Sequence, residues 1–104
     1  MASGTLGQSA PSAVTNTTVY TVPSGKTATF NVNICNRSYV TGMLVRIAVC
    51  ASSTPANSEY IEYDVPIDPN SAIERTGIVA SAGKLVVVYA STADASVNVY
   101  GFEE

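Results

Sequence analysis

The residues of this chain that could do covalent or acid–base chemistry are few. Two thiols, Cys35 and Cys50, have no partner that could act as a general base, because the 104 residues include no histidine. The absence of histidine also removes the commonest ligand of protein zinc sites. We therefore expect that the protein is not an enzyme, and we assign it no catalytic residue, no cofactor and no metal ligand.

Four carboxylates, Glu59, Glu62, Asp64 and Asp68, form the one acidic cluster in the sequence. Carboxylate oxygens are ligands that Ca²⁺ accepts, so a cation site is the chemical alternative here. We favour a solvated strand face on which like charges are kept apart, because nothing in the sequence marks a cleft. Whether the cluster binds a cation stays open at this level.

The letters Gly25-Lys26-Thr27 match the end of a phosphate-binding loop. That loop needs a second glycine five residues before the first of these, and Tyr20 occupies the position. It also needs a helix to follow, whereas an alternating strand pattern follows here. We therefore exclude nucleotide binding and interpret Lys26 as a charge at a turn between strands.

The elements that must position these groups are β-strands. Residues 26–36 alternate strictly, with Ala28, Phe30, Val32 and Ile34 apolar, and residues 43–51 repeat the pattern with Met43, Val45, Ile47 and Val49 apolar. We predict that the two runs form a hairpin through residues 37–42, with the following opposed pairs: Ile34 with Val45, Val32 with Ile47, and Phe30 with Val49.

This register also places Arg46 opposite Asn33, Cys35 opposite Leu44, and Cys50 opposite Thr29. The two thiols would then lie on the order of 20 Å apart along the strands. A disulfide requires Cα atoms within about 7 Å. We therefore expect free thiols, consistent with assembly in a reducing cytoplasm.

Further strands follow at short, regular intervals. The pattern predicts strands at residues 17–22, 27–36, 43–51, 59–65, 72–79, 84–91 and 96–102. We expect a bend at Gly77, burial of residues 85–89 on both sides, and either a break or an edge position at Pro66. One apolar sheet face needs a second sheet against it. We predict an all-β, single-domain antiparallel β-sandwich of seven or eight strands, a jelly roll or related Greek key.

Two domain segments are expected from composition. Residues 17–104 would form the sandwich, with Glu103 and Glu104 ending in solvent. Residues 1–16 are rich in Ser, Ala, Gly and Thr and predict a flexible or extended N-terminal arm that orders only against another surface. The sequence contains no run of about twenty apolar residues, so we predict no transmembrane helix.

The surface composition favours protein contacts. Charged residues make up 12% of the chain and hydrophobic residues 46%, and a net charge of −3 from few, scattered charges argues against nucleic-acid binding. Six tyrosines add half-polar rings of the kind found in interfaces, although an ordinary amphipathic surface is the alternative. Our candidate contact residues are Leu6, Pro11, Val14, Tyr20, Asn33, Tyr39, Leu44, Arg46, Tyr60 and Tyr100.

Two segments carry a resemblance to a known group of proteins. Residues 19–38 (VYTVPSGKTATFNVNICNRS) and 73–104 (IERTGIVASAGKLVVVYASTADASVNVYGFEE) resemble small virion proteins of tailed bacteriophages, over roughly residues 17–104. Such proteins are similar to capsid decoration (cement) proteins and small tail proteins built on a β-sandwich. The resemblance implies a virion location, a homo-oligomer with a trimer favoured, and the major capsid protein as partner, with neither nucleic acid nor membrane.

We therefore expect a head decoration protein that stabilises the capsid surface by protein–protein contacts, with residues 2–16 lying across neighbouring capsid subunits. The alternative is a tail- or fibre-associated module for host-surface attachment. In that case the loops at residues 52–58 and 64–71 would carry the specificity. The number of copies in each virion separates the two.

Overall fold

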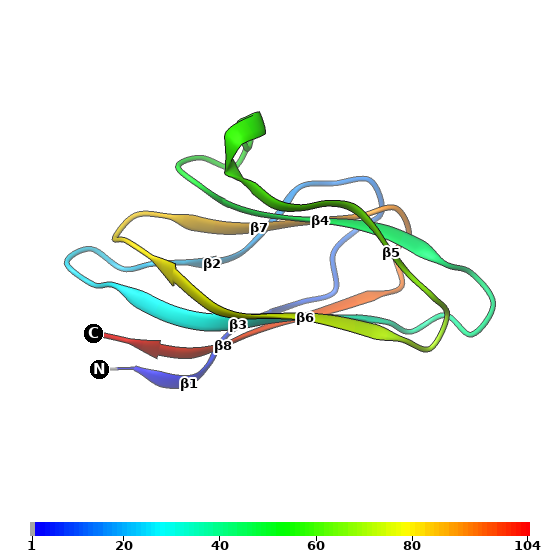
Figure 1. Ribbon diagram of the computed structural model, residues 1–104, viewed down its shortest axis with the longest axis horizontal. Helices are drawn as coiled ribbons and strands as arrows, with labels where there is room; N and C mark the ends of the chain where they lie inside the picture. Colours follow the sequence, from blue (N-terminus) through cyan, green and yellow to red (C-terminus); the bar gives the residue numbers. More distant parts are fainter. Residues whose placement is uncertain (1) are drawn as a thin grey trace.

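A computed structural model describes residues 2–104 of the chain. The strands are β1 (Ser3–Ser9), β2 (Thr17–Thr21), β3 (Ala28–Asn36), β4 (Met43–Cys50), β5 (Tyr60–Ile67), β6 (Ala72–Ala80), β7 (Leu85–Ala90) and β8 (Ala95–Glu103), and one 3₁₀ turn, η1 (Asn57–Glu59), precedes β5 (Figure 1). No helix within this part of the chain is long and apolar enough to cross a membrane.

The strands form two packed antiparallel sheets, visible as the lower and upper layers of Figure 1. Sheet I has the order β1-β8-β3-β6, and sheet II has the order β2-β7-β4-β5. Every connection except that between β4 and β5 crosses from one sheet to the other. This is the strand order of a jelly roll, so the predicted all-β sandwich is confirmed.

The alternation in the sequence decides which faces meet. In β3 the even-numbered residues from Ala28 to Asn36 are buried and the odd-numbered ones are partly exposed. In β4, Met43, Val45 and Ile47 are buried in the same core. β7 is buried along most of its length on both sides, as its continuous apolar run predicts.

The predicted β3–β4 hairpin is wrong. β3 pairs with β6 and β8 in sheet I, and β4 pairs with β5 and β7 in sheet II. Arg46 therefore lies opposite Tyr89, while Asn33 lies opposite Asn98. The apolar faces of β3 and β4 meet across the sandwich. The alternation requires only that these faces be buried, and packing against the facing sheet buries them.

Asn36 stabilises the segment in which the chain crosses from sheet I to sheet II. It is fully buried, and its amide nitrogen donates hydrogen bonds to the carbonyl oxygens of Thr41 (2.9 Å) and Ile67 (3.2 Å). Its amide oxygen accepts from the backbone N–H of Ser38 at 3.0 Å. The buried amide of Asn36 thus provides hydrogen-bond partners for backbone groups of the crossover. In a tight hairpin, such groups would pair with each other instead.

Two expectations for the chain ends are corrected. Residues 3–9 of the predicted arm form edge strand β1, which pairs antiparallel with β8. Glu103, expected in solvent, is buried, and the hydroxyl of Tyr20 on β2 donates a hydrogen bond of 2.5 Å to its carboxylate. This hydrogen bond joins sheet II to sheet I near the chain termini.

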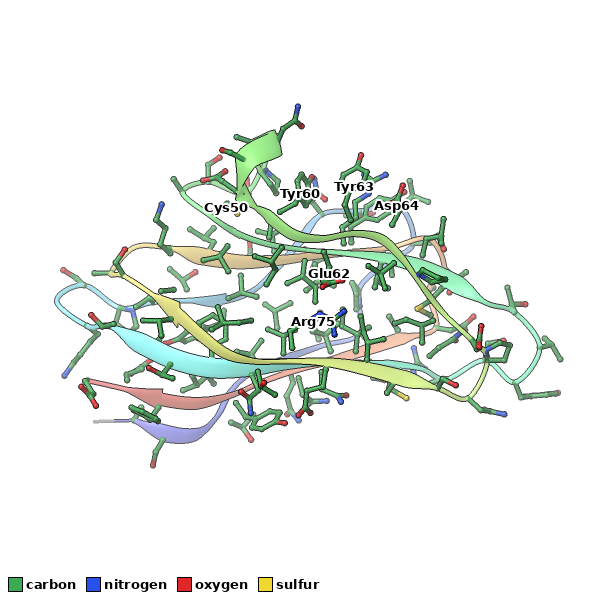
Figure 2. All side chains as sticks on the ribbon, in the orientation of Figure 1. Cys50, Tyr60, Glu62, Tyr63, Asp64 and Arg75 are labelled. Carbon is green, nitrogen blue, oxygen red and sulfur yellow. The ribbon has the colours of Figure 1, made fainter. Side chains whose placement is uncertain are left out.

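The opposite side of the sandwich is joined by an ion pair between its two edge strands. Arg75 of β6 pairs with Glu62 of β5, and Figure 2 shows both side chains between the layers. β5 is an edge strand that continues through Pro66, so of the two possibilities for this proline the edge position is correct and the break is not. β6 has a register irregularity next to Gly77, where the bend was expected.

Candidate protein-contact face

The outer surface of sheet II carries a group of aromatic and charged side chains around Arg46. The guanidinium carbon of Arg46 lies 4.3 Å from the ring centre of Tyr63 and 4.2 Å from that of Tyr89. Its Nε donates to Asp64 at 2.7 Å. We call the set Leu44, Arg46, Tyr60, Tyr63, Asp64 and Tyr89 the tyrosine–arginine face.

Local strand geometry brings these side chains together. Arg46 and Tyr89 are directly paired on β4 and β7, so their side chains share one side of the sheet. On β5 the register with β4 shifts between Val45 and Ile47, and Asp64 adopts a positive φ of 52°. In this β-bulge two residues of β5 lie opposite one of β4, so both Tyr63 and Asp64 reach Arg46.

The electrostatics of the Arg46 group are internally balanced. The hydrogen bond from Arg46 to Asp64 raises the pKa of the guanidinium above its ordinary value, so Arg46 remains charged. Two aromatic ring faces and one carboxylate then surround that charge. A cation held in this way can enter an interface without becoming an unpaired buried charge.

A second aromatic contact and a small apolar cluster support this surface from below. The rings of Tyr60 and Tyr63 pack edge to face with centres 5.0 Å apart. Beneath Tyr60, the side chains of Ala48, Cys50 and Val87 form a buried cluster on the outer side of sheet II. Figure 2 shows Cys50 and Tyr60 beneath the η1 turn.

The loop before β5 is closed by a carboxylate. Glu59 accepts hydrogen bonds from the backbone N–H groups of Ala56 (2.8 Å) and Ala51 (3.0 Å). These bonds lower the pKa of Glu59, the Ala56 bond most strongly. The loop at residues 52–58 is therefore anchored at both ends beside Tyr60.

The outer surface of sheet I has a different character. Asn33, Asn98 and Gln8 form a row across the strands, with Gln8 donating to Asn98 at 2.7 Å. Tyr100 donates to Glu74 at 2.6 Å, and this hydrogen bond raises the pKa of the tyrosine hydroxyl. This amide-rich surface has its donors and acceptors largely paired with one another.

The predicted contact residues are divided between these surfaces and the interior. Leu44, Arg46 and Tyr60 belong to the tyrosine–arginine face; Asn33 and Tyr100 lie on the outer surface of sheet I; Val14 and Tyr39 are exposed in connecting loops. Three candidates lie inside the protein instead: Tyr20 is buried in the core, Pro11 is buried in the connection between β1 and β2, and Leu6 packs against the core.

The burial of Tyr20 is a correction with a physical reason. Its ring packs edge to face on Phe30 at 5.9 Å, and its hydroxyl finds Glu103. The register of β2 against β7 shifts between Thr18 and Tyr20, which alters the side of the strand that Tyr20 presents. A period-two pattern cannot anticipate such a shift.

Tyr63, Asp64 and Tyr89 were missed by sequence analysis. In an unbroken strand, alternation would put Tyr63 on the face opposite Tyr60. The sequence contains one weak indication of a bulge at this point: Asp64 follows Tyr63, and aspartate tolerates the positive φ that a bulge can require.

The four acidic residues are not gathered at one point. Glu59 binds backbone amides, Glu62 pairs with Arg75, and Asp64 pairs with Arg46. Across residues 2–104, no group of three or more His, Cys, Asp or Glu side chains is placed to hold a metal ion. Both cysteines are free thiols; Cys35 is partly exposed, and burial raises the pKa of Cys50.

Comparison with known proteins returned no relatives. No protein-family model matches the chain, and no curated protein or solved structure matches it.

Proposed function

We propose that this protein is a structural component of a bacteriophage virion, a decoration protein that binds the outside of the capsid and stabilises it. It would act by binding energy, through its tyrosine–arginine face. The observation that carries this proposal is the placement of Arg46 between Tyr63 and Tyr89, with Asp64 completing the contact. Tyrosine and arginine, together with tryptophan, are enriched among the residues that dominate the binding energy of protein interfaces.

The exposure of this group suits a partner surface. Tyr63 is 56% exposed and Leu44 is 42% exposed, although both are large apolar side chains on strands. Around them the strands and the anchored loop at residues 52–58 hold the side chains in place before any partner arrives. Preorganised side chains lose little conformational entropy on binding, which favours affinity.

The mode of action follows from mass action. A protein that binds assembled capsid subunits and not the separated ones stabilises the assembly by its binding free energy. Many copies on one shell add to the effect. The resemblance of residues 19–38 and 73–104 to small phage virion proteins supports the proposal. The jelly roll, which also occurs in viral capsid domains, is a weaker, fold-level association.

The test uses capsids of the encoding phage assembled without this protein. We expect the purified protein to bind them, and Tyr63→Ala to weaken binding by about tenfold or more, since truncating a central interface residue costs about 2 kcal/mol. Arg46→Lys keeps the charge but loses the planar stacking, so it should weaken binding too. Val79→Ala is the matched control, because Val79 is 64% exposed on sheet I, away from this face.

Two results would contradict the proposal. Equal losses for Tyr63→Ala and Val79→Ala would mean that the tyrosine–arginine face is not the docking surface. Mass-spectrometric counting that finds a handful of copies in each virion, located at the tail, would exclude decoration and favour the tail-module alternative.

A further inference from the structure

Three loops meet at one end of the sandwich, which we call the loop end: residues 37–42, 68–71 and 91–94. Backbone hydrogen bonds join them, from Asn70 to Ser38 (2.9 Å), from Arg37 to Asp94 (2.9 Å) and from Ser91 to Leu44 (2.9 Å). The loop end is therefore one surface built from segments far apart in the sequence.

An apolar tip projects from this surface. Tyr39 is 79% exposed and Val40 is 73% exposed, the two highest values among the large hydrophobic residues of positions 2–104. Around them, Ser38 accepts hydrogen bonds through its hydroxyl from the N–H groups of Val40 (3.2 Å) and Thr41 (3.0 Å). The tip is thus a formed turn that presents two apolar side chains to solvent.

A pocket lies at the base of the same loop. It has a volume of about 220 Å³, and its apolar lining comes from Met43, Leu44, Pro66 and Ile67. Asp68 also lines it. The apolar part of this lining offers van der Waals contact to an apolar side chain of the kind that the tip presents.

The loop end carries a positive and a negative side chain that form no ion pair with described residues. Arg37 and Asp68 are both exposed, and neither has an ion-pair partner within residues 2–104, where the two ion pairs are Arg46–Asp64 and Arg75–Glu62. Arg37 donates instead to the carbonyl oxygen of Ala93 at 2.9 Å. One surface therefore carries a cation, an anion, an apolar projection and a recess lined in part by apolar side chains.

We infer that the loop end binds the loop end of a second copy of this chain, across a two-fold axis. The Tyr39–Val40 tip of each copy enters the pocket of the other, and Arg37 of each copy pairs with Asp68 of the other. A two-fold contact is self-complementary, so each of these interactions occurs twice. Leu44 is the one residue of the tyrosine–arginine face that also lines this pocket. The experiments below change no residue of that face, so they test this inference separately from capsid binding.

A charge-reversal experiment tests the pairing. Sedimentation velocity of the isolated protein should show a weak dimer, with a Kd in the micromolar range or above, because such an end contact buries less than about 1,200 Å². Arg37→Asp alone and Asp68→Arg alone should each be monomeric, because like charges then meet at both contacts. An equimolar mixture of the two variants should dimerise, because every contact again joins opposite charges.

The apolar half of the contact has its own test. Tyr39→Ser and Val40→Ser should each weaken the dimer by about tenfold or more without changing the circular dichroism spectrum, since both side chains are exposed. Val79→Ser, equally apolar and exposed on sheet I, should leave the dimer unchanged.

Three outcomes would overturn the inference. The parent protein could remain monomeric up to about 1 mM. The single charge-reversal variants could dimerise as well as the parent does. The protein could form a trimer, which the phage resemblance favours; a ring of three cannot alternate the two variants, so the mixture would then fail to restore assembly.

Discussion

The hydrogen bond between Tyr20 and Glu103 gives a direct measure of how the two sheets are held together. Tyr20→Phe removes the hydroxyl and keeps the ring, which packs on Phe30 with ring centres 5.9 Å apart. Any loss of stability therefore reports the hydrogen bond and not the apolar contact. Glu103 is 8% exposed, so its carboxylate would lose its partner without gaining full access to water.

The magnitude follows from these two facts. Hydrogen bonds to charged groups contribute about 1.5–3 kcal/mol, and an unsatisfied buried acceptor costs a similar amount. We expect Tyr20→Phe to lower the free energy of unfolding by about 2 kcal/mol, measured by urea denaturation with an unchanged m-value. Tyr39→Phe is the matched control, because Tyr39 is 79% exposed, and it should change the free energy by less than about 0.5 kcal/mol.

The same contact sets a pH dependence. Burial, followed by the hydrogen bond and the charge of Glu103, raises the pKa of Tyr20 in the folded protein. The folded state then holds the phenolic proton more tightly than the unfolded chain does. This stabilisation is complete below about pH 10, the ordinary value for tyrosine, and is lost as the pH rises above it. Tyr20→Phe should flatten this alkaline loss, and equal stability of the variant and the parent would refute the reasoning.

Two further predictions concern the backbone. Gly101→Ala should destabilise the fold by about 1–3 kcal/mol, because the added Cβ would lie 2.1 Å from the carbonyl oxygen of Thr29; Gly42→Ala, where the nearest such atom is 3.7 Å away, should be nearly neutral in the same thermal unfolding assay. Glu59→Gln should speed hydrogen exchange at the amides of Ala51 and Ala56 at neutral pH. The lowered pKa of Glu59 means that the parent loses this protection only as the pH falls below about 4.5, whereas the variant lacks it throughout.

Most of the strand positions and buried faces could be predicted from the sequence. The alternation in residues 26–36 and 43–51 identifies which side chains enter the core, and the structure buries them, Val49 only partly. The choice of neighbouring strand could not be predicted in this way. Two strands that each have one apolar face can be neighbours in a hairpin or can face each other from two sheets. Both arrangements fit the same alternation.

Asn36 is the residue that could have indicated the crossover between the sheets. Asn36 continues the buried even-numbered series of β3, and a polar side chain in that phase indicates a special role. Its hydrogen bonds to Thr41 and Ile67 stabilise the crossover to sheet II. A hairpin at residues 37–42 would have no need of a fully buried amide at this point.

The candidate site was predicted in part. Arg46, Leu44 and Tyr60 were identified because outward positions on a strand follow from the alternation. Tyr63 and Asp64 were not, because β5 has two register shifts against β4. The shift between Tyr60 and Glu62 puts Tyr63 on the same side as Tyr60, and the shift next to Asp64 brings Asp64 to Arg46. Tyr20 failed for a similar reason, at the register shift in β2.

The most direct test of the proposed function is cryo-electron microscopy of the virions of the phage that we propose to encode this protein. Our account predicts many copies of the sandwich on the outside of the capsid, with Arg46 and Tyr63 in contact with a capsid subunit. It would be contradicted by density for the protein at the tail alone, or by copies on the capsid that dock through the amide-rich surface of sheet I with the tyrosine–arginine face in solvent.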